Sequence, residues 1–372
     1  MLVYLYIFLV CGNLLYITKK KNSPILALLS VALIIVIMGG NDNNADYEGY
    51  KYFYSREVQS GSLEIGFVKL IQLGNLLHLE YNYFVLSISI ICIVILSVIV
   101  FKHTEQYHLV IAAYMLFMLF LDTIQIRNFI MMTLFYLAFE ALQNKRKILF
   151  LFILFLSFLI HFGTLPLFIY FFVKPLEQKK SIYPKLIFGT VVVIALITFV
   201  NGNQIPFINN IANSLLSGRE DKNVYFNTRT NLGFLTTFFL YFYNLFLVYI
   251  SYKFVHENSK CVDEAALKYV DSSYQIALIS SFALPLSMMN SNFSRYIRIN
   301  NISLYISVAI VVSLLFRGGN SSLDSRSILV FNKRISKQTY LVLVFFNLFM
   351  WIVLKGVPES MIEIIRNNIF FR

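Results

Sequence analysis

The sequence predicts an all-α fold, a polytopic bundle of transmembrane helices. Of the 372 residues, 58% are hydrophobic and only 13% are charged, whereas a soluble domain carries about 25% charged residues. The apolar runs 82–101, 233–252 and 297–316 each reach the roughly 20 residues that cross a hydrocarbon core. These runs are continuous and do not alternate as barrel strands do, which predicts helices. We therefore expect residues 1–372 to form a single integral membrane domain with about 12 spans.

The first apolar run, residues 1–17, is predicted to be a retained span. It has neither the basic start nor the small-residue cleavage site of a signal peptide. Basic clusters orient the other spans, because short cytoplasmic loops collect Lys and Arg. These clusters lie at 19–21, 102–103, 145–147, 174–185, 253–268 and 317–337. With all of them inside, both termini face outward, and the predicted spans lie near 2–17, 24–39, 82–101, 107–122, 124–143, 147–161, 162–174, 184–200, 233–252, 270–289, 297–316 and 338–355.

Four segments are predicted to lie on the outer side, and one of them is the short segment at about 290–298. Residues 63–80 are too polar for a span, and counting them as one would move the basic cluster 145–147 outside. We therefore interpret 40–80 as an outer loop with an interfacial or re-entrant helix. Residues 201–232 form a second outer loop. A C-terminal tail follows, whose apolar residues are expected to lie on the membrane surface as an amphipathic turn: Met361, Ile364, Ile365 and Ile369.

The composition excludes several classes of function. The net charge of +12 follows from the positive-inside rule, and without a basic soluble domain no nucleic acid partner is expected. The three cysteines have neither metal-binding nor redox spacing. There is no Walker loop and no GxGxxG motif, which disfavours an ATP-driven pump. We expect no cofactor and no metal site.

Arginine and lysine are distributed unequally between the two predicted sides. The cytoplasmic clusters hold four arginines and 15 lysines, whereas the outer side holds eight arginines and four lysines. Any positive charge serves to orient a span, but the planar fork of Arg suits phosphate and carboxylate. The outer face is therefore predicted to bind an anionic ligand. Its arginines are Arg56, Arg127, Arg219, Arg229, Arg295, Arg298, Arg366 and Arg372.

The loop 39–50 combines carboxylates, amides and tyrosines at the outer end of the second predicted span. Two interpretations stand side by side. The loop is either a solvated segment whose polar residues favour turns, or a sugar-binding loop. In the second case Asp46, or Glu64 further along, is the candidate general base, and Tyr47 and Tyr50 are the candidate sugar-contacting residues.

Arg127 and His161 lie next to apolar runs. A charge in such a position is costly and usually has a function, so Arg127 is a candidate ligand of a lipid diphosphate, with Gln125 beside it in the substrate site. Alternatively, Arg127 is an interfacial arginine that pairs with Asp122. His161 is either a base, proton donor or hydroxyl-orienting group, or a structural histidine at a helix corner.

Four further outer arginines are candidate diphosphate ligands. Arg295 and Arg298 are three residues apart and would share one face of a helix. Arg219 and Arg229 belong to the second outer loop. The alternative for all four is an interfacial anchor or a salt bridge.

Five short motifs follow one another along residues 1–310. They are Asp46-Tyr47-x-x-Tyr50, Glu64-x-Gly66-Phe67, Ile126-Arg127, an apolar segment ending in His161, and Arg295-Tyr296. Their order and predicted sidedness resemble the EpsG family of Wzy-like polysaccharide polymerases. This sequence departs from the family pattern at Asn128, where Gln is common, at Ile65 and Phe67, where Pro and Tyr are common, and at 39–42, which contains no Arg.

The resemblance implies a bacterial cytoplasmic-membrane enzyme with an outward-facing site. Such a polymerase joins oligosaccharide repeat units carried on undecaprenyl diphosphate, in the synthesis of capsule, exopolysaccharide or O-antigen. The acceptor hydroxyl attacks the donor anomeric carbon and the lipid diphosphate leaves, so cations should stabilise the leaving group. A chain-length regulator and a flippase are the implied protein partners. The implied roles are Arg127 with Arg295 or Arg298 on the diphosphate, and Asp46, Glu64 or His161 on the acceptor.

Three other functions compete with this interpretation. A lipid-linked oligosaccharide flippase should carry charges at mid-bilayer depth and two related halves, which the sequence does not show. A membrane O-acyltransferase needs a deep histidine reached from the cytoplasm, whereas His161 is predicted on the outer side. A non-catalytic scaffold would leave the outer arginine excess without a reason.

Overall fold

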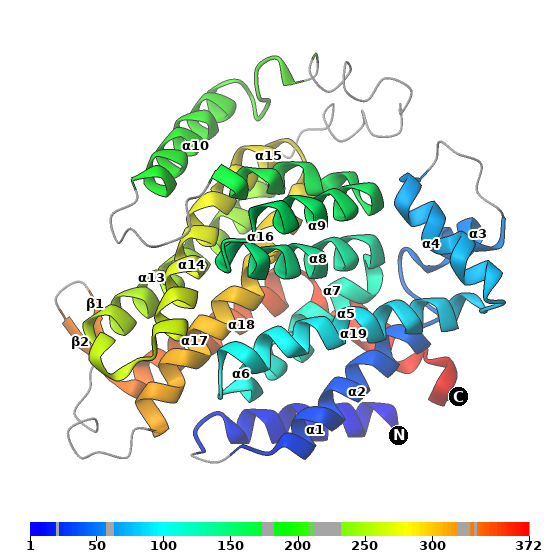
Figure 1. The fold of residues 1–372 in the computed structure, drawn as a ribbon, viewed down its shortest axis with the longest axis horizontal. Coiled ribbons are helices and arrows are strands. Elements are labelled where there is room, and N and C mark those ends of the chain that lie inside the picture. Colours follow the sequence, from blue (N-terminus) through cyan, green and yellow to red (C-terminus); the bar gives the residue numbers. More distant parts are fainter. Residues whose placement is uncertain are drawn as a thin grey trace.

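The computed structural model is helical along most of the chain (Figure 1), as the sequence predicts. It describes residues 1–19, 22–56, 63–172, 182–208, 210, 232–317, 328–330 and 333–371. The elements of the first half are α1 (Leu2–Tyr16), α2 (Pro24–Gly40), α3 (Tyr47–Ser55), α4 (Ile65–Leu76), α5 (Tyr81–His103), α6 (Tyr107–Ala113), the π-helix η1 (Tyr114–Met118), α7 (Leu119–Ile124), α8 (Ile126–Gln143), α9 (Lys147–Ile160) and the 3₁₀ helix η2 (Phe162–Phe172).

The second half continues the helical pattern and adds one short hairpin. Its helices are α10 (Tyr183–Val200), α13 (Phe234–Glu257), η3 (Ser259–Cys261), α14 (Glu264–Ile279), η4 (Ser280–Phe282), α15 (Ala283–Met289), η5 (Ser291–Ser294), α16 (Arg295–Arg298), α17 (Asn300–Arg317), α18 (Lys337–Leu354), α19 (Val357–Arg366) and η6 (Ile369–Phe371). Strands β1 (Ile328–Val330) and β2 (Lys333–Ile335) pair antiparallel, with Leu329 opposite Arg334.

Side-chain caps define the starts of several of these helices. The Ser23 side chain accepts a hydrogen bond from the Leu26 amide, and Pro24 occupies the first turn of α2. Asp263 caps α14 and Ser336 caps α18 in the same way. Each cap satisfies an amide that has no partner within its helix, so these residues set where the helices begin.

By length and composition, five described helices can cross a membrane. They are α5, the unit from α6 through α7, α13, the unit from η5 through α17, and α18. Shorter apolar helices accompany them: α1, α2, α4, α9, η2 and most of α10. Large apolar side chains such as Ile91 and Val98 on α5 are exposed, which suits contact with lipid and not with water. These are the helices of a multi-pass membrane protein, and the count of about 12 spans stays a prediction.

Two predicted spans differ from simple α-helices. The segment 270–289 is interrupted, because α14 gives way to η4 before α15 begins. The segment 162–174 contains the 3₁₀ helix η2, with Pro166 inside it; proline lacks the amide proton that a regular helix needs there.

The predicted outer loop 40–80 contains two short helices, α3 and α4, at one edge of the bundle (Figure 1). Its interfacial placement remains a prediction.

Buried amides join the helices in the core. Asn244 on α13 donates to Asn301 on α17 at 2.8 Å and accepts from Asn347 on α18 at 3.0 Å. Trp351 donates to the same Asn244 oxygen. Each of these side chains is almost fully buried, so hydrogen bonding compensates their removal from water. The network fixes α13, α17 and α18 as one unit.

The C-terminal helix α19 corrects one prediction. Its residues Ile364 and Ile365, expected on the membrane surface, are 1% and 3% exposed. They belong to the main hydrophobic core, so the apolar face of α19 packs against the protein itself. The sequence pattern shows that such a face exists but does not tell lipid from protein as its partner.

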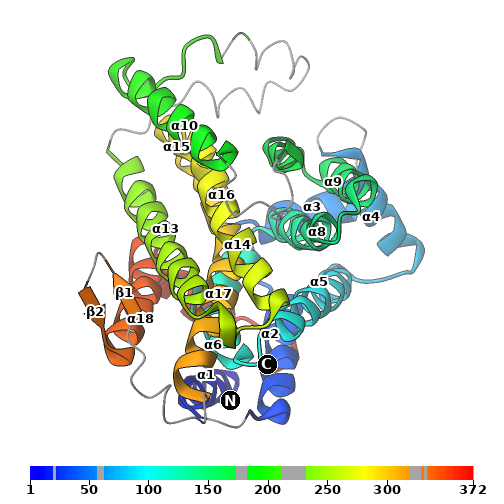
Figure 2. The same cartoon turned by 60° about the vertical axis from the view of Figure 1, so that its left-hand side comes forward.

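Residues after α19 fold back onto the end of α2, and Figures 1 and 2 both place the C-terminus beside that helix. The Asn368 side chain donates to the Val36 carbonyl at 3.0 Å. The Asn41 side chain donates to the Asn367 carbonyl at 3.1 Å, and the Asp42 amide donates to that carbonyl at 3.2 Å. The C-terminal segment therefore shapes the loop that follows α2.

Basic residues lie at the end of the bundle where α5 and α8 end and α9 begins. Lys102 and His103, at the end of α5, both contact Glu140 near the end of α8. The His103 ring lies 4.1 Å from that of Tyr269 on α14. At this end of the bundle lie the predicted cytoplasmic clusters 102–103 and 145–147, because α9 begins directly after α8.

Candidate functional site

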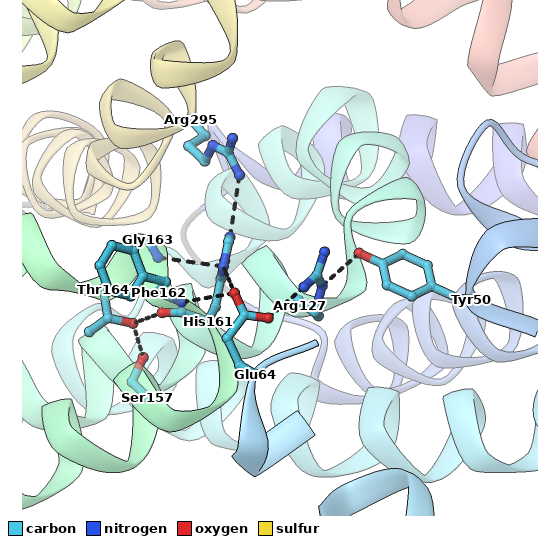
Figure 3. Close-up of polar contacts among 9 residues, drawn as sticks. All are labelled: Tyr50, Glu64, Arg127, Ser157, His161, Phe162, Gly163, Thr164 and Arg295. Atoms are coloured by element: carbon cyan, nitrogen blue, oxygen red, sulfur yellow. Dashed lines mark hydrogen bonds and ion pairs between the residues drawn. The ribbon is translucent and has the colours of Figure 1, made fainter. Parts of the chain in front are cut away.

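Five polar side chains, which we call the polar row, touch one another in sequence at the other end of these helices. They are Tyr50, Arg127, Glu64, His161 and Arg295 (Figure 3). Arg127 Nη1 lies 2.6 Å from Glu64 Oε2, and Arg127 Nε donates to the Tyr50 hydroxyl at 3.1 Å. Two different guanidinium nitrogens thus hold a carboxylate and a phenol, which fixes the plane of Arg127.

His161 lies between Glu64 and Arg295 (Figure 3). Its Nδ1 is 3.7 Å from Glu64 Oε1, and its Nε2 is 3.3 Å from Arg295 Nη1. A guanidinium only donates hydrogen bonds, so Nε2 must be the unprotonated nitrogen and Nδ1 carries the proton toward Glu64. The Gly163 amide, 3.5 Å from Nδ1, then cannot donate to it. His161 is therefore a neutral link between a carboxylate and a cation.

The turn after α9 is held in place by its own hydrogen bonds. The Thr164 hydroxyl contacts the His161 carbonyl and the Ser157 hydroxyl, both at 2.8 Å. The Phe162 amide points at Glu64 Oε1 from 3.3 Å. This amide lies in the first turn of η2, where a carboxylate acceptor is favourable. Glu64 therefore ties the turn at His161 to Arg127.

A glycine allows Glu64 to reach this turn. Helix α4 begins one residue after Glu64 and packs against the end of α9. A Cβ on Gly66 would lie 2.7 Å from both the carbonyl carbon and the oxygen of Leu159. Only glycine permits this approach of backbone to backbone, which gives a physical reason for the Glu64-x-Gly66 spacing.

Asp46 faces the polar row from the loop between α2 and α3. It is exposed, and no hydrogen bond joins its carboxylate to another described residue. Loss of water around the carboxyl raises the pKa of Asp46, while the charges of Arg127 and Arg295 act in the opposite direction. Asp46 is thus an accessible carboxylate within the field of both arginines.

Tyr47 anchors the loop that carries Asp46. The Tyr47 ring is 6% exposed, and its hydroxyl donates to Asn82 on α5 at 2.9 Å. The Asn82 amide in turn donates to the Asn41 carbonyl at 2.9 Å. Tyr50 reaches Arg127 directly, so the two tyrosines predicted as sugar contacts have different neighbours.

Arg298 lies in a second group, which we call the Arg298 cluster and which also contains Tyr114, Asp122 and Gln125. Arg298 Nη2 donates to Gln125 Oε1 at 3.1 Å and lies 3.5 Å from Asp122 Oδ1. Tyr114 donates to the other Asp122 oxygen at 3.0 Å. The Arg298 and Asp122 side chains are 4% and 0% exposed, so this cluster is buried and holds the junction of α7 and α8.

Lys355 is a cation near the site that the sequence interpretation did not select. It is the first residue beyond α18, and its Nζ donates to the Ser294 hydroxyl at 3.0 Å. Burial, helped by the charge of Arg298, lowers the pKa of Lys355 to about 8. A lysine at the end of a span is ordinarily an interfacial anchor, so nothing in the sequence separated it from the other lysines. The predicted ligands Arg219 and Arg229 lie outside the described residues.

The arrangement combines the accessible carboxylate of Asp46 with two partly buried cations, Arg127 and Arg295, that small-molecule anions can approach. Within the described part of the chain, no three His, Cys, Asp or Glu side chains are grouped as metal ligands. Carboxylate, imidazole and guanidinium groups can supply proton transfer and binding of anions.

The chain matches the model of one protein family. The EpsG family model covers residues 25–366, which include the polar row, the Arg298 cluster and Lys355. No curated protein and no solved structure matches the chain. Since the family match extends over nearly the whole sequence, the chain belongs to the EpsG family of Wzy-like polysaccharide polymerases.

Proposed function

We propose that the protein polymerises oligosaccharide repeat units carried on undecaprenyl diphosphate at the outer face of the bacterial cytoplasmic membrane. The proposal rests chiefly on one observation: Glu64, Arg127, His161 and Arg295, far apart in the sequence, form a continuous set of contacts. Family membership supplies the reaction class, and this site supplies groups suited to it.

Asp46 is the proposed base for the acceptor sugar. Among Asp46, Glu64 and His161, only Asp46 is exposed and has a carboxylate without a hydrogen-bond partner among the described residues. Glu64 is 4% exposed and already holds Arg127 and the Phe162 amide. A base must reach the hydroxyl proton and have a vacant lone pair, and this requirement favours Asp46.

Arg127 and Arg295 are proposed to hold the leaving diphosphate. The acceptor oxygen forms a bond to the donor anomeric carbon while the bond from that carbon to the phosphate oxygen breaks. The hydroxyl proton passes to Asp46, and the bonding electrons leave with the diphosphate. Fixed positive charge at the departing oxygen lowers the barrier. Glu64 and His161 set the positions of the two arginines.

The outward orientation is inferred from the two ends of the bundle. The ends that carry the polar row lie opposite the end where Lys102 and His103 meet Glu140. Since basic residues collect on the cytoplasmic side, the polar row is expected on the outer side. Lipid-linked repeat units must be delivered there, which implies a flippase as a functional partner.

Purified protein in detergent, supplied with lipid-linked repeat units, tests the proposal. A polymerase elongates the saccharide and releases one lipid diphosphate for each bond formed. The matched control is Lys69→Ala, because Lys69 is exposed and its only hydrogen bond to a described residue is the one that it donates to Gln72. A monodisperse preparation that binds the substrate but forms no longer saccharide would refute the proposal. Transport in vesicles without elongation would identify a flippase instead.

A further inference from the structure

We propose that Lys355 and Arg295 form a diphosphate subsite at the end of α18, with the buried Arg298 between them. The inference rests on the proposed function, and it adds a residue that the reaction scheme above does not contain. It adds Lys355 to Arg127 and Arg295, the two cations proposed above to hold the leaving diphosphate.

The position of Lys355 is fixed by the turn that follows it. Gly356 has a φ of +61°, a conformation that glycine adopts without strain, and α19 begins directly afterward. The chain therefore reverses at Lys355, and the side chain crosses to η5, where it meets the Ser294 hydroxyl. Ser294 immediately precedes Arg295, so the two cations approach the same short segment from different elements.

The charges in this region do not balance. Arg298 has Asp122 as its ion-pair partner, whereas neither Arg295 nor Lys355 forms an ion pair with a described carboxylate. Three cations thus share one bound carboxylate. Asp46 acts on Arg295 only through its field, without a hydrogen bond. Half-buried positive charge without a partner is unfavourable, and a bound anion would relieve it.

A diphosphate suits this arrangement better than a single phosphate. Arg298 is 4% exposed and already contacts Asp122 and Gln125. It therefore adds positive electrostatic potential at the subsite but little direct contact with a bound diphosphate. Lys355 and Arg295 are only partly buried, so both ammonium and guanidinium remain accessible. Two linked anionic groups can meet two separated cations at once, which a lone phosphate cannot.

Binding of farnesyl diphosphate to the purified full-length protein tests the subsite without any need for turnover. We expect Lys355→Ala to weaken this binding about 10- to 100-fold, as expected for a lost charge-assisted hydrogen bond, and to affect farnesyl monophosphate much less. Inorganic pyrophosphate, measured in parallel, separates a lipid-borne diphosphate from a free one. Lys69→Ala is the matched control, and thermal unfolding of each variant reports folding.

Each outcome decides between the two proposals. Unchanged farnesyl diphosphate binding in folded Lys355→Ala overturns the subsite, whether or not the wild type elongates saccharides. Absence of binding to the wild type also overturns it. Weakened binding by the variant, together with a wild type that never elongates, supports the subsite and refutes the polymerase. Tight binding of pyrophosphate alone would overturn the lipid-linked form of the proposal.

A pH profile separates binding by Lys355 from a structural role. The apparent KM for the lipid-linked donor should rise above pH of about 8, where Lys355 loses its proton, and Lys355→Arg should remove this rise because arginine stays charged. The elements that adjoin Lys355 carry further titratable and charged groups, and of these the charge of Arg298 acts on Lys355. They are Tyr114 on η1, Asp122 on α7, Arg295, Tyr296 and Arg298 on α16, and Glu359, Glu363 and Arg366 on α19. A structural role for Lys355 predicts equal profiles for wild type and Lys355→Arg, and that result would contradict the subsite.

Discussion

Replacing Gly66 by alanine tests how closely the site depends on the packing of α4. The new Cβ would lie 2.7 Å from the backbone of Leu159, whereas ordinary contacts begin at 3.4 Å. Helix α4 must therefore retreat by about 0.7 Å, a distance that no side-chain rotation can absorb because the obstacle is backbone. Glu64 moves with it, and its 3.3 Å contact with the Phe162 amide passes beyond hydrogen-bonding distance.

The expected consequence is a loss of activity much larger than the loss of stability. A misplacement near 1 Å in a catalytic arrangement costs on the order of 100-fold in rate, so we expect Gly66→Ala to reduce elongation by roughly 10- to 100-fold. The assay is the initial rate of saccharide elongation, normalised to the amount of folded protein in the membrane.

Gly49→Ala is the matched control for this substitution. Gly49 lies within α3, beside Tyr50, and a Cβ there meets nothing within 4 Å. Alanine should stabilise α3 by about 0.5–1 kcal/mol and leave the rate unchanged. If Gly66→Ala elongates at the wild-type rate, the inference that Glu64 must sit against the turn at His161 is wrong.

Three other predictions concern separate parts of the site. Arg127→Ala should stop polymer formation and leave single repeat units on the lipid, with normal protein levels. Arg127→Lys should restore little of the polymer formation, because Tyr50 and Glu64 bind two different nitrogens of the Arg127 guanidinium. Partial loss of water around the exposed Asp46 carboxyl outweighs the charges of Arg127 and Arg295 and raises its pKa, so the wild-type rate should fall as the pH drops through that raised pKa. Asp46→Asn should be nearly inactive and should lack this acid limb; an acid limb retained by the variant would exclude Asp46 as the base. Asn368→Ala removes side-chain hydrogen bonds to α2 and should destabilise the protein by about 1–2 kcal/mol, measured by thermal unfolding; an unchanged unfolding midpoint would contradict that role.

The sequence predicts which residues meet better than it predicts how they are held. Glu64, Arg127, His161 and Arg295 stand out because each polar group borders an apolar run, where its presence needs a reason. Their mutual contacts agree with the predicted convergence. The roles assigned to these residues stay proposals.

The sequence does not predict how deeply each arginine is buried or which residues it contacts. Arg295 and Arg298 are three residues apart, which predicts a shared helix face, yet Arg295 is half-buried beside His161 and Arg298 is buried with Asp122. Spacing gives direction around a helix and not distance from the surface. The sequence does not distinguish Lys355 from other lysines for a similar reason. A lysine at the end of a span is commonly an interfacial anchor, and only the structure shows which residues surround it.

The contacts of the segment after α19 with α2 and with the loop that follows α2 form only after the C-terminal helices have been synthesised. Asn41 donates a hydrogen bond to the carbonyl of Ile364, 323 positions later in the sequence, and Asn367 holds the next loop residue. During synthesis, the loop of Asp46 must wait for α18 and α19 to insert before it can take its final shape. The nascent protein should therefore stay inactive until α18 and α19 have emerged and the segment after them has folded back onto α2.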